Sequence, residues 1–147
     1  MGEILKESLL EAVFDMDQFF PAGYVIELGK NRYYRKYQDG KILCSAIAGA
    51  KRFLKREDAE RFARRHLGYV DMEAYLCEVG WVLLSAESEV MDCDQYWNGR
   101  QFTSDREKAR VFSSYQETSS YQKRNGLEAV SMIDQQVFRR AQFRVAA

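Results

Sequence analysis

Two short stretches, Tyr37-Gln38-Asp39-Gly40-Lys41 and Tyr96-Trp97-Asn98-Gly99-Arg100, decide how this chain of 147 residues folds. Each places Asp-Gly or Asn-Gly between residues typical of β-strands, which is a strong signal for a hairpin turn. Outward from each turn glycine, an alanine follows after ten residues, a phenylalanine after thirteen, and a further aromatic residue nine positions later (Ala50, Phe53 and Phe62; Ala109, Phe112 and Tyr121). These equal spacings indicate that one structural unit occurs twice.

The two predicted units cover residues 23–79 and 80–136. Gly-Tyr-Val opens the first and Gly-Trp-Val opens the second, and five of the 26 aligned pairs between residues 40–65 and 99–124 are identical. The opening and turn glycines are 17 residues apart in unit 1 and 19 in unit 2. A two-residue difference preserves which side chains of a strand face the core.

Each unit is predicted to form the same series of elements: a strand, a second strand through the hairpin turn, a short helical segment, a brief strand, a helix and a closing strand. The brief strands are predicted at 51–53 and 110–112, the helices at 55–67 and about 115–124, and the closing strands at 69–78 and 127–133. Ser104-Asp105-Arg106-Glu107 fits a capping box at the start of the second short segment.

Segments outside the repeat complete the predicted α+β fold. Residues 1–22 are predicted to contain an amphipathic helix, because apolar side chains recur in them at three- and four-residue spacings. Pro21 ends this predicted helix. The basic residues 137–147 are either one more strand or a basic arm. We therefore expect an N-terminal helix packed on two tandem hairpin-helix-strand units, whose antiparallel strands form one sheet or two facing sheets.

Charge is segregated along the sequence although Lys plus Arg and Asp plus Glu both total 22. Basic and acidic residues number 1 and 5 in residues 1–22, 12 and 8 in 23–79, 6 and 9 in 80–136, and 3 and 0 in 137–147. The segment charges are therefore −4, +4, −3 and +3. Such segregation favours charge-complementary contact with a partner, with a second copy of the chain, or between the two halves.

Composition and motifs exclude several classes of function. No apolar run reaches the ~18 residues of a membrane span, and residues 1–6 lack the pattern of a secretory leader. The three cysteines are too widely spaced for a zinc site, so we expect a cytoplasmic protein with reduced thiols. Neither a Walker loop nor a dinucleotide fingerprint is present, so no cofactor, metal or catalytic residue is predicted.

The strongest basic cluster belongs to the predicted helix of unit 1 and its approach, with Arg52, Arg56, Arg61, Arg64 and Arg65. Tyrosines alternate with basic residues in the preceding hairpin. Cations for phosphates and flat rings for bases are what nucleic-acid surfaces use, although arginine is also ordinary on the exposed face of a helix. Tyr34 and Trp97, beside the hairpin turns, are the predicted exposed aromatic anchors for a partner.

Glu87, Glu89, Asp92 and Asp94 form the densest acidic stretch. On a strand, the odd offset between the two pairs would put them on opposite faces, which disfavours a shared cation. The alternatives are a solvated hairpin arm and a partner-facing patch that imitates phosphates. His66, the single histidine, ends a helix and is expected to pack or cap there, because no partner for acid-base catalysis is apparent.

Residues 23–136 resemble the small ββα-type modules common in phage and mobile-element accessory proteins, which include anti-CRISPR inhibitors. The shared features are the Asp/Asn-Gly hairpin, the Ala-x-x-Phe motif and the charged helix after it. The resemblance implies a non-enzymatic inhibitor that occupies a macromolecular surface, such as that of a host defence nuclease complex, with a protein or ribonucleoprotein as partner. The alternatives are a nucleic-acid-binding module that uses the basic face of unit 1 and, third, a small enzyme without a linear motif. The sequence is also compatible with a homodimer.

Overall fold

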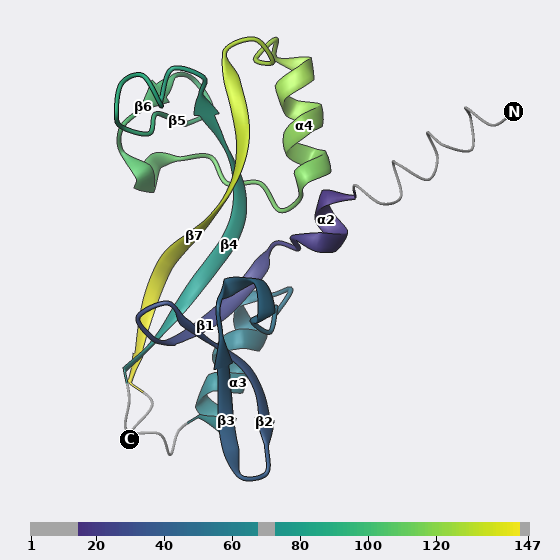
Figure 1. Ribbon diagram of the computed structural model, residues 1–147, viewed down its shortest axis with the longest axis vertical. Helices are drawn as coiled ribbons and strands as arrows, with labels where there is room; N and C mark the ends of the chain where they lie inside the picture. The colour runs from purple at the N-terminus through teal and green to yellow at the C-terminus, as the bar shows by residue number, and fades with distance from the viewer. Residues whose placement is uncertain (1–14, 68–72, 145–147) are drawn as a thin grey trace, which may run out of the picture.

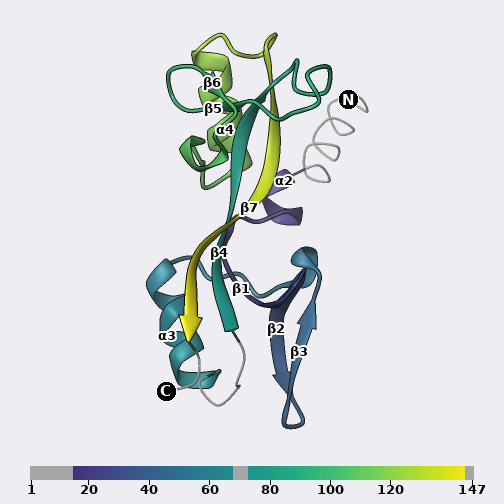
Figure 2. The same ribbon diagram turned by 90° about the vertical axis from the view of Figure 1, so that its left-hand side faces the viewer.

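The computed structural model describes residues 15–67 and 73–144, and these build one antiparallel sheet with helices. Seven strands lie in the described part, in the order β3-β2-β1-β4-β5-β6, and β7 pairs with β4 outside this path. The predicted α+β class is confirmed, and a single sheet forms rather than two facing ones. Figure 1 shows an elongated body in which the β4 and β7 pair joins two lobes, and Figure 2 shows the same division from the side.

The elements follow the predicted order in both units. Unit 1 consists of β1 (Gly23–Gly29), β2 (Arg32–Gln38), β3 (Lys41–Ser45), the 3₁₀ segment η1 (Ile47–Gly49), α3 (Arg56–His66) and the start of β4 (Glu73–Ser85). Unit 2 consists of the rest of β4, β5 (Tyr96–Trp97), β6 (Phe102–Thr103), the 3₁₀ segment η2 (Arg106–Lys108), α4 (Tyr115–Arg124) and β7 (Ser131–Arg144). A short helix, α2 (Met16–Phe19), precedes them.

Strand β4 belongs to both units. Its first part pairs with β1 at residues 75–79, and its end pairs with β5 at Leu84. The predicted boundary between residues 79 and 80 therefore falls inside a strand and does not separate two domains. β7 likewise runs unbroken through the predicted boundary at 136/137, because its second half continues the ladder with β4. The C-terminal residues up to Arg144 are strand, while the predicted strand residues 69–72 lie outside the described part.

The same backbone bridge closes each unit. The N–H groups of Tyr24 and Phe53 each donate to the other's carbonyl at 2.8 Å. Trp81 and Phe112 make the equivalent pair, at 3.0 and 2.7 Å. The brief strands predicted at 51–53 and 110–112 are thus reduced to single bridges. The opening glycines lie against them, since a Cβ at Gly23 would sit 2.8 Å from the Phe53 carbonyl oxygen.

Register also repeats between the units. Tyr24 pairs with Glu78 across β1 and β4, and Trp81 pairs with Gln135 across β4 and β7. Trp81 lies 57 positions after Tyr24, and Gln135 lies 57 positions after Glu78. After the hairpins the offset becomes 59, because η2 starts at Arg106 and η1 at Ile47, and α4 and α3 keep the same difference. The net difference of two residues arises between the opening strand and the 3₁₀ segment, where unit 2 is longer before Trp97 and shorter after it.

Each unit packs its bridge phenylalanine beneath its helix. The ring centroids of Phe53 and Phe62 are 5.3 Å apart, and those of Phe112 and Tyr121 are 5.0 Å apart. Phe53 is 9% exposed and Phe112 is 3% exposed, so both equivalent phenylalanines are buried. Equivalent aromatic pairs therefore fix each helix on the sheet.

The N-terminal segment docks on unit 2. The Asp17 carboxylate accepts hydrogen bonds from the N–H groups of Tyr115 at 2.5 Å and Gln116 at 3.1 Å, so it caps the free N–H groups at the start of α4. The start of η2 is capped by Asp105, whose carboxylate accepts from Glu107 N–H, instead of the predicted Ser104. Of the helix predicted within residues 1–22, only Met16–Phe19 is helix in the described part, and residues 1–14 lie outside it.

We expect Phe112→Ala and Phe53→Ala each to lower the free energy of unfolding by about 3 to 5 kcal/mol, because each leaves a cavity between helix and sheet. Urea denaturation followed by circular dichroism measures the change. Leu54→Ala is the matched control, since its side chain is 88% exposed and should change stability by less than about 0.5 kcal/mol. A loss below about 1 kcal/mol in both phenylalanine variants would contradict the burial of the two rings, and such a small loss in only one of them would contradict the equivalence of the two sites.

Candidate functional site

A groove on unit 1 lies between α3 and the β2–β3 hairpin. It has a volume of about 370 Å³ and is lined by Tyr34, Tyr37, Phe62, Arg65, His66 and Leu67. This volume falls within the roughly 300 to 1,000 Å³ usual for ligand pockets. No carboxylate is among the lining residues, so the groove combines aromatic walls with positive charge.

The aromatic residues of the groove have two different roles. Tyr34 is 5% exposed and packs on Phe62 at 4.9 Å, so it belongs to the core below the groove. Tyr37, three residues on, is 56% exposed and forms the outer wall. His66 packs on the ring of Phe62 at 4.8 Å, as expected for a histidine at a helix end.

The two aromatic anchors predicted for a partner are therefore structural residues. Tyr34 is buried, and Trp97 is half-buried with its Nε1–H donating to the Tyr121 hydroxyl at 3.0 Å. The physical reason is that β2 is covered on both faces at this point, so the consecutive Tyr33 and Tyr34 are buried in different clusters of the core. An irregularity of register between Tyr34 and Lys36 then places Tyr37 on the same face as Tyr34. Tyr37 is the exposed ring that the prediction missed, and the alternation beyond this irregularity is its only signal.

The predicted basic residues divide into engaged and free ones. Arg52 donates to the backbone carbonyls of Pro21, Ile47 and Ala50, and burial lowers the pKa of its guanidinium. Arg56 pairs with Glu60 at 3.0 Å, and Arg61 with Asp58 at 3.8 Å. Within the described residues, no carboxylate lies in ion-pair range of the exposed Arg64 or Arg65. Of the predicted basic residues, those two arginines are therefore available to a partner.

The fold collects charge of each sign in one lobe. Residues 23–67, 73–79 and 137–144 contain 15 Lys plus Arg and 7 Asp plus Glu, a net charge of +8. Residues 15–22 and 80–136 contain 6 and 11, a net charge of −5. β7 brings its arginines beside unit 1, so the two basic segments of the sequence share one lobe. Figures 1 and 2 show the lobes at opposite ends of the molecule.

Two consecutive arginines of β7 form ion pairs with glutamates of other elements. Arg139 binds the Glu27 carboxylate of β1, which is 6% exposed. Arg140 binds Glu78 of β4 at 2.6 Å and reaches Glu107 of η2 at 3.3 Å. Because these arginines hold strands and lobes together, they are not free to bind a partner.

The acidic residues Glu87, Glu89, Asp92 and Asp94 lie on a loop, not on the predicted hairpin arm. Turns replace strand from residue 86 to 92, and all four side chains are exposed. The argument from opposite strand faces therefore does not apply. Among the described residues, no cluster of three or more His, Cys, Asp or Glu side chains is arranged to hold a metal ion.

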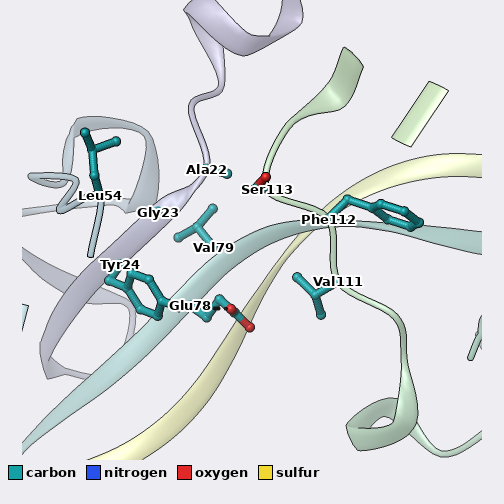
Figure 3. Close-up of a pocket in the computed structure, with 9 residues that line it drawn as sticks. All are labelled: Ala22, Gly23, Tyr24, Leu54, Glu78, Val79, Val111, Phe112 and Ser113. Carbon is teal, nitrogen blue, oxygen red and sulfur yellow. Dashed lines mark hydrogen bonds between the residues drawn. The ribbon is translucent and has the colours of Figure 1, made fainter. Parts of the chain in front are cut away.

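A second hollow, of about 230 Å³, lies where the lobes meet (Figure 3). Its lining includes Tyr24 and Glu78 from one side and Val111 and Phe112 from the other. The Glu78 carboxylate is engaged there, because it accepts from the Tyr24 hydroxyl at 3.4 Å and from Arg140. The hollow is smaller than usual ligand pockets and offers mainly apolar surface, so the unit 1 groove is the stronger candidate.

The three cysteines differ in their exposure to solvent. Cys77 is 1% exposed, and burial together with the nearby Glu27 carboxylate raises the pKa of its thiol to about 11. Cys44 is half-buried and Cys93 is exposed. A buried neutral thiol is a poor nucleophile, so Cys77 acts as a core residue.

Searches with the whole chain match no protein family, no curated protein and no solved structure. In the described ranges, no helix is long and apolar enough to cross a membrane.

Truncation to alanine should lower the stability of the protein at Tyr34 but hardly change it at Tyr37. We expect Tyr34→Ala to lower the free energy of unfolding by about 3 kcal/mol, because it empties a core position. Tyr37→Ala should change it by less than about 0.5 kcal/mol, since the ring is largely exposed. Urea titrations of both variants test the assignment, which fails if Tyr37→Ala is the more destabilising.

Alkylation of the native protein at about pH 8 should label Cys93 and spare Cys77. The raised pKa keeps the Cys77 thiol protonated at that pH, and burial excludes the reagent. Peptide mass mapping after iodoacetamide treatment gives the order of reaction, and labelling in urea is the control in which both cysteines react. Equal rates in the native protein would contradict the burial of Cys77.

Proposed function

We propose that the chain is a non-enzymatic, cytoplasmic binding protein whose unit 1 groove holds single-stranded nucleic acid. The observation that carries this proposal is the exposed Tyr37 ring, which faces the last turn of α3 across a groove in the lobe of charge +8. Exposed rings and cations are the two groups that single-strand binding needs, because bases stack and phosphates attract positive charge.

The chemistry of the groove supports an unpaired base. Tyr37 and the Phe62–His66 pair supply flat surfaces, and the guanidinium of Arg65 lines the same space. A base in a duplex is stacked on its neighbours and cannot enter such a groove, whereas a base of a single strand can. Arg64 and the hairpin cations Arg35, Lys36 and Lys41 extend the positive surface for the backbone.

Unit 2 lacks this groove for a structural reason. Lys51 N–H donates to Tyr34 carbonyl, and Arg110 N–H donates to Trp97 carbonyl, both at 2.9 Å, so Tyr34 and Trp97 hold equivalent places. β2 continues four residues past Tyr34, but β5 ends at Trp97. Unit 2 therefore has no strand residue that corresponds to Tyr37. The groove distinguishes two units that otherwise share their design.

The second candidate is the inhibitor that the resemblance to phage and mobile-element proteins implies. The specific observation in its favour is the apolar floor of the same groove, formed by Phe62 and Leu67. Such a floor suits an aromatic or aliphatic anchor of a protein, and protein interfaces concentrate their affinity in anchors of that kind. In this candidate function, the chain would bind a protein or ribonucleoprotein complex through the groove and cover part of its surface.

Fluorescence anisotropy with labelled oligonucleotides of about twelve residues tests the first candidate. We expect binding of single-stranded RNA or DNA that weakens about fiftyfold from about 50 to about 200 mM salt, as for contact with about four phosphates. Tyr37→Ala should weaken binding at least about fivefold, because stacking on one aromatic side chain contributes about 1 to 3 kcal/mol per base.

Charge reversal has a matched control within the chain. Arg64→Glu with Arg65→Glu should abolish binding, while Lys123→Glu with Arg124→Glu, at the equivalent positions of α4, should leave most of it. Both pairs change the net charge equally and lie on exposed helix ends. Absence of binding at tens of micromolar protein and low salt, or equal loss in both pairs, overturns the nucleic-acid proposal and leaves the protein partner.

A further inference from the structure

In the described part of the chain, the loop at the far end of unit 2 exposes apolar side chains. Val90 is 88% exposed and Met91 is 55% exposed. Val130, 47% exposed, precedes β7 beside the same loop, because Ala86 N–H donates to its carbonyl at 2.8 Å. Contiguous apolar side chains rimmed by polar ones are typical of contact surfaces.

Hydrogen bonds hold this loop, residues 86–94, in one shape. Ser88 is 3% exposed, and its hydroxyl accepts from Gln95 N–H at 3.0 Å. The N–H groups of Val90 and Met91 both donate to the Glu87 carbonyl, at 3.1 and 3.0 Å. An ordered loop loses little conformational entropy when it docks, which favours binding through it.

The charge of the loop defines the kind of partner that it fits. Its carboxylates, Glu87, Glu89, Asp92 and Asp94, are exposed, and none is in an ion pair with the described residues. A matching surface must therefore be basic around an apolar hollow. The unit 1 groove has both properties, because Arg65 stands over a floor of Phe62 and Leu67. A methionine thioether such as that of Met91 also packs favourably on aromatic rings.

We propose that loop 86–94 docks into the unit 1 groove of a second copy of this chain. Figures 1 and 2 show α3 and the β2–β3 hairpin, which line the groove, at the opposite end of the elongated body from the segment between β4 and β5 that contains the loop, so a molecule does not bind its own loop. The contact joins different surfaces head to tail, which produces chains unless a ring closes. Because one loop in one groove buries little area, the association is weak and depends on salt.

This inference goes beyond the proposed function and shares its groove. Self-association and nucleic acid would compete for Arg64, Arg65 and Tyr37. An acidic loop in the groove thus keeps it covered until a strand of higher charge density displaces the loop. The two proposals stay separable, because self-association is measured on protein free of nucleic acid.

Sedimentation velocity from about 10 µM to about 1 mM protein tests self-association at low and at high salt. We expect the weight-average mass to rise above the 17.2 kDa of the monomer at about 50 mM salt and to return to it at about 500 mM. A single monomeric species throughout the low-salt series overturns the proposal. Self-association that persists unchanged at high salt also overturns it, since the docking would then not be ionic.

A charge-swap experiment assigns the surfaces. Glu89→Arg with Asp92→Arg, and separately Arg64→Glu with Arg65→Glu, should each be monomeric at low salt. An equimolar mixture of the two should associate again, because each variant then meets a surface of opposite charge. Lys123→Glu with Arg124→Glu is the control and should associate like the unaltered chain. If the mixture stays monomeric while the unaltered chain associates, the contact uses other surfaces and the proposal is wrong.

Addition of a single-stranded oligonucleotide relates the two uses of the groove. If both proposals hold, the oligonucleotide converts the associated protein into monomers bound to nucleic acid. Self-association that requires Arg64 and Arg65 while no oligonucleotide binds would support the docking alone. Oligonucleotide binding to a protein that is monomeric at low salt would support the proposed function and overturn the docking.

Discussion

The structure depends on strand β4, which two units share. β1 and β5 pair with it at different points along its length. β7 pairs with every residue from Glu73 to Ser85, and the register shifts once along the way. Its side chains are buried on both faces, with Leu76, Val82 and Leu83 fully inaccessible. A strand covered on both faces must be apolar nearly throughout, and its sequence has that composition. Both lobes are positioned by this strand, so their opposite charges are held apart.

Much of the fold could be predicted because the spacing between turn, bridge and helix is local. Asp39 and Gly40 have φ angles of 53° and 76°, the left-handed pair that such a hairpin turn requires. α4 spans the predicted residues, and α3 differs from its prediction by one residue at each end. The sharing of β4 was not predictable, because periodicity shows where a strand lies but not that its two ends serve different units.

The candidate site was predicted less well because its geometry depends on irregular pairing. Tyr34 was predicted from its place beside the hairpin turn but is buried, whereas Tyr37, beyond the irregularity of β2, is exposed. Arg52 looked like a surface cation but binds backbone carbonyls, which sequence does not reveal. Arg64 and Arg65, two of the predicted basic residues, are exposed as expected, because they lie on the last turn of an amphipathic helix that packs through Ala59 and Ala63.

The irregularity in the β4–β7 ladder has a consequence for how the chain tolerates changes in length. Leu76 pairs with Ala141 and Cys77 with Arg139, so Arg140 is an extra residue that bulges from the ladder. The bulge lets Arg140 bind Glu78 while Ala141 packs in the core beside Leu76. Deletion of Arg140 would remove the bulge and keep Ala141 opposite Leu76, whereas deletion of a paired residue of β7 would turn the side chains beyond it to the opposite face. Paired insertions are absorbed at the hairpins, but the central ladder accepts a single insertion only where the strand already bulges.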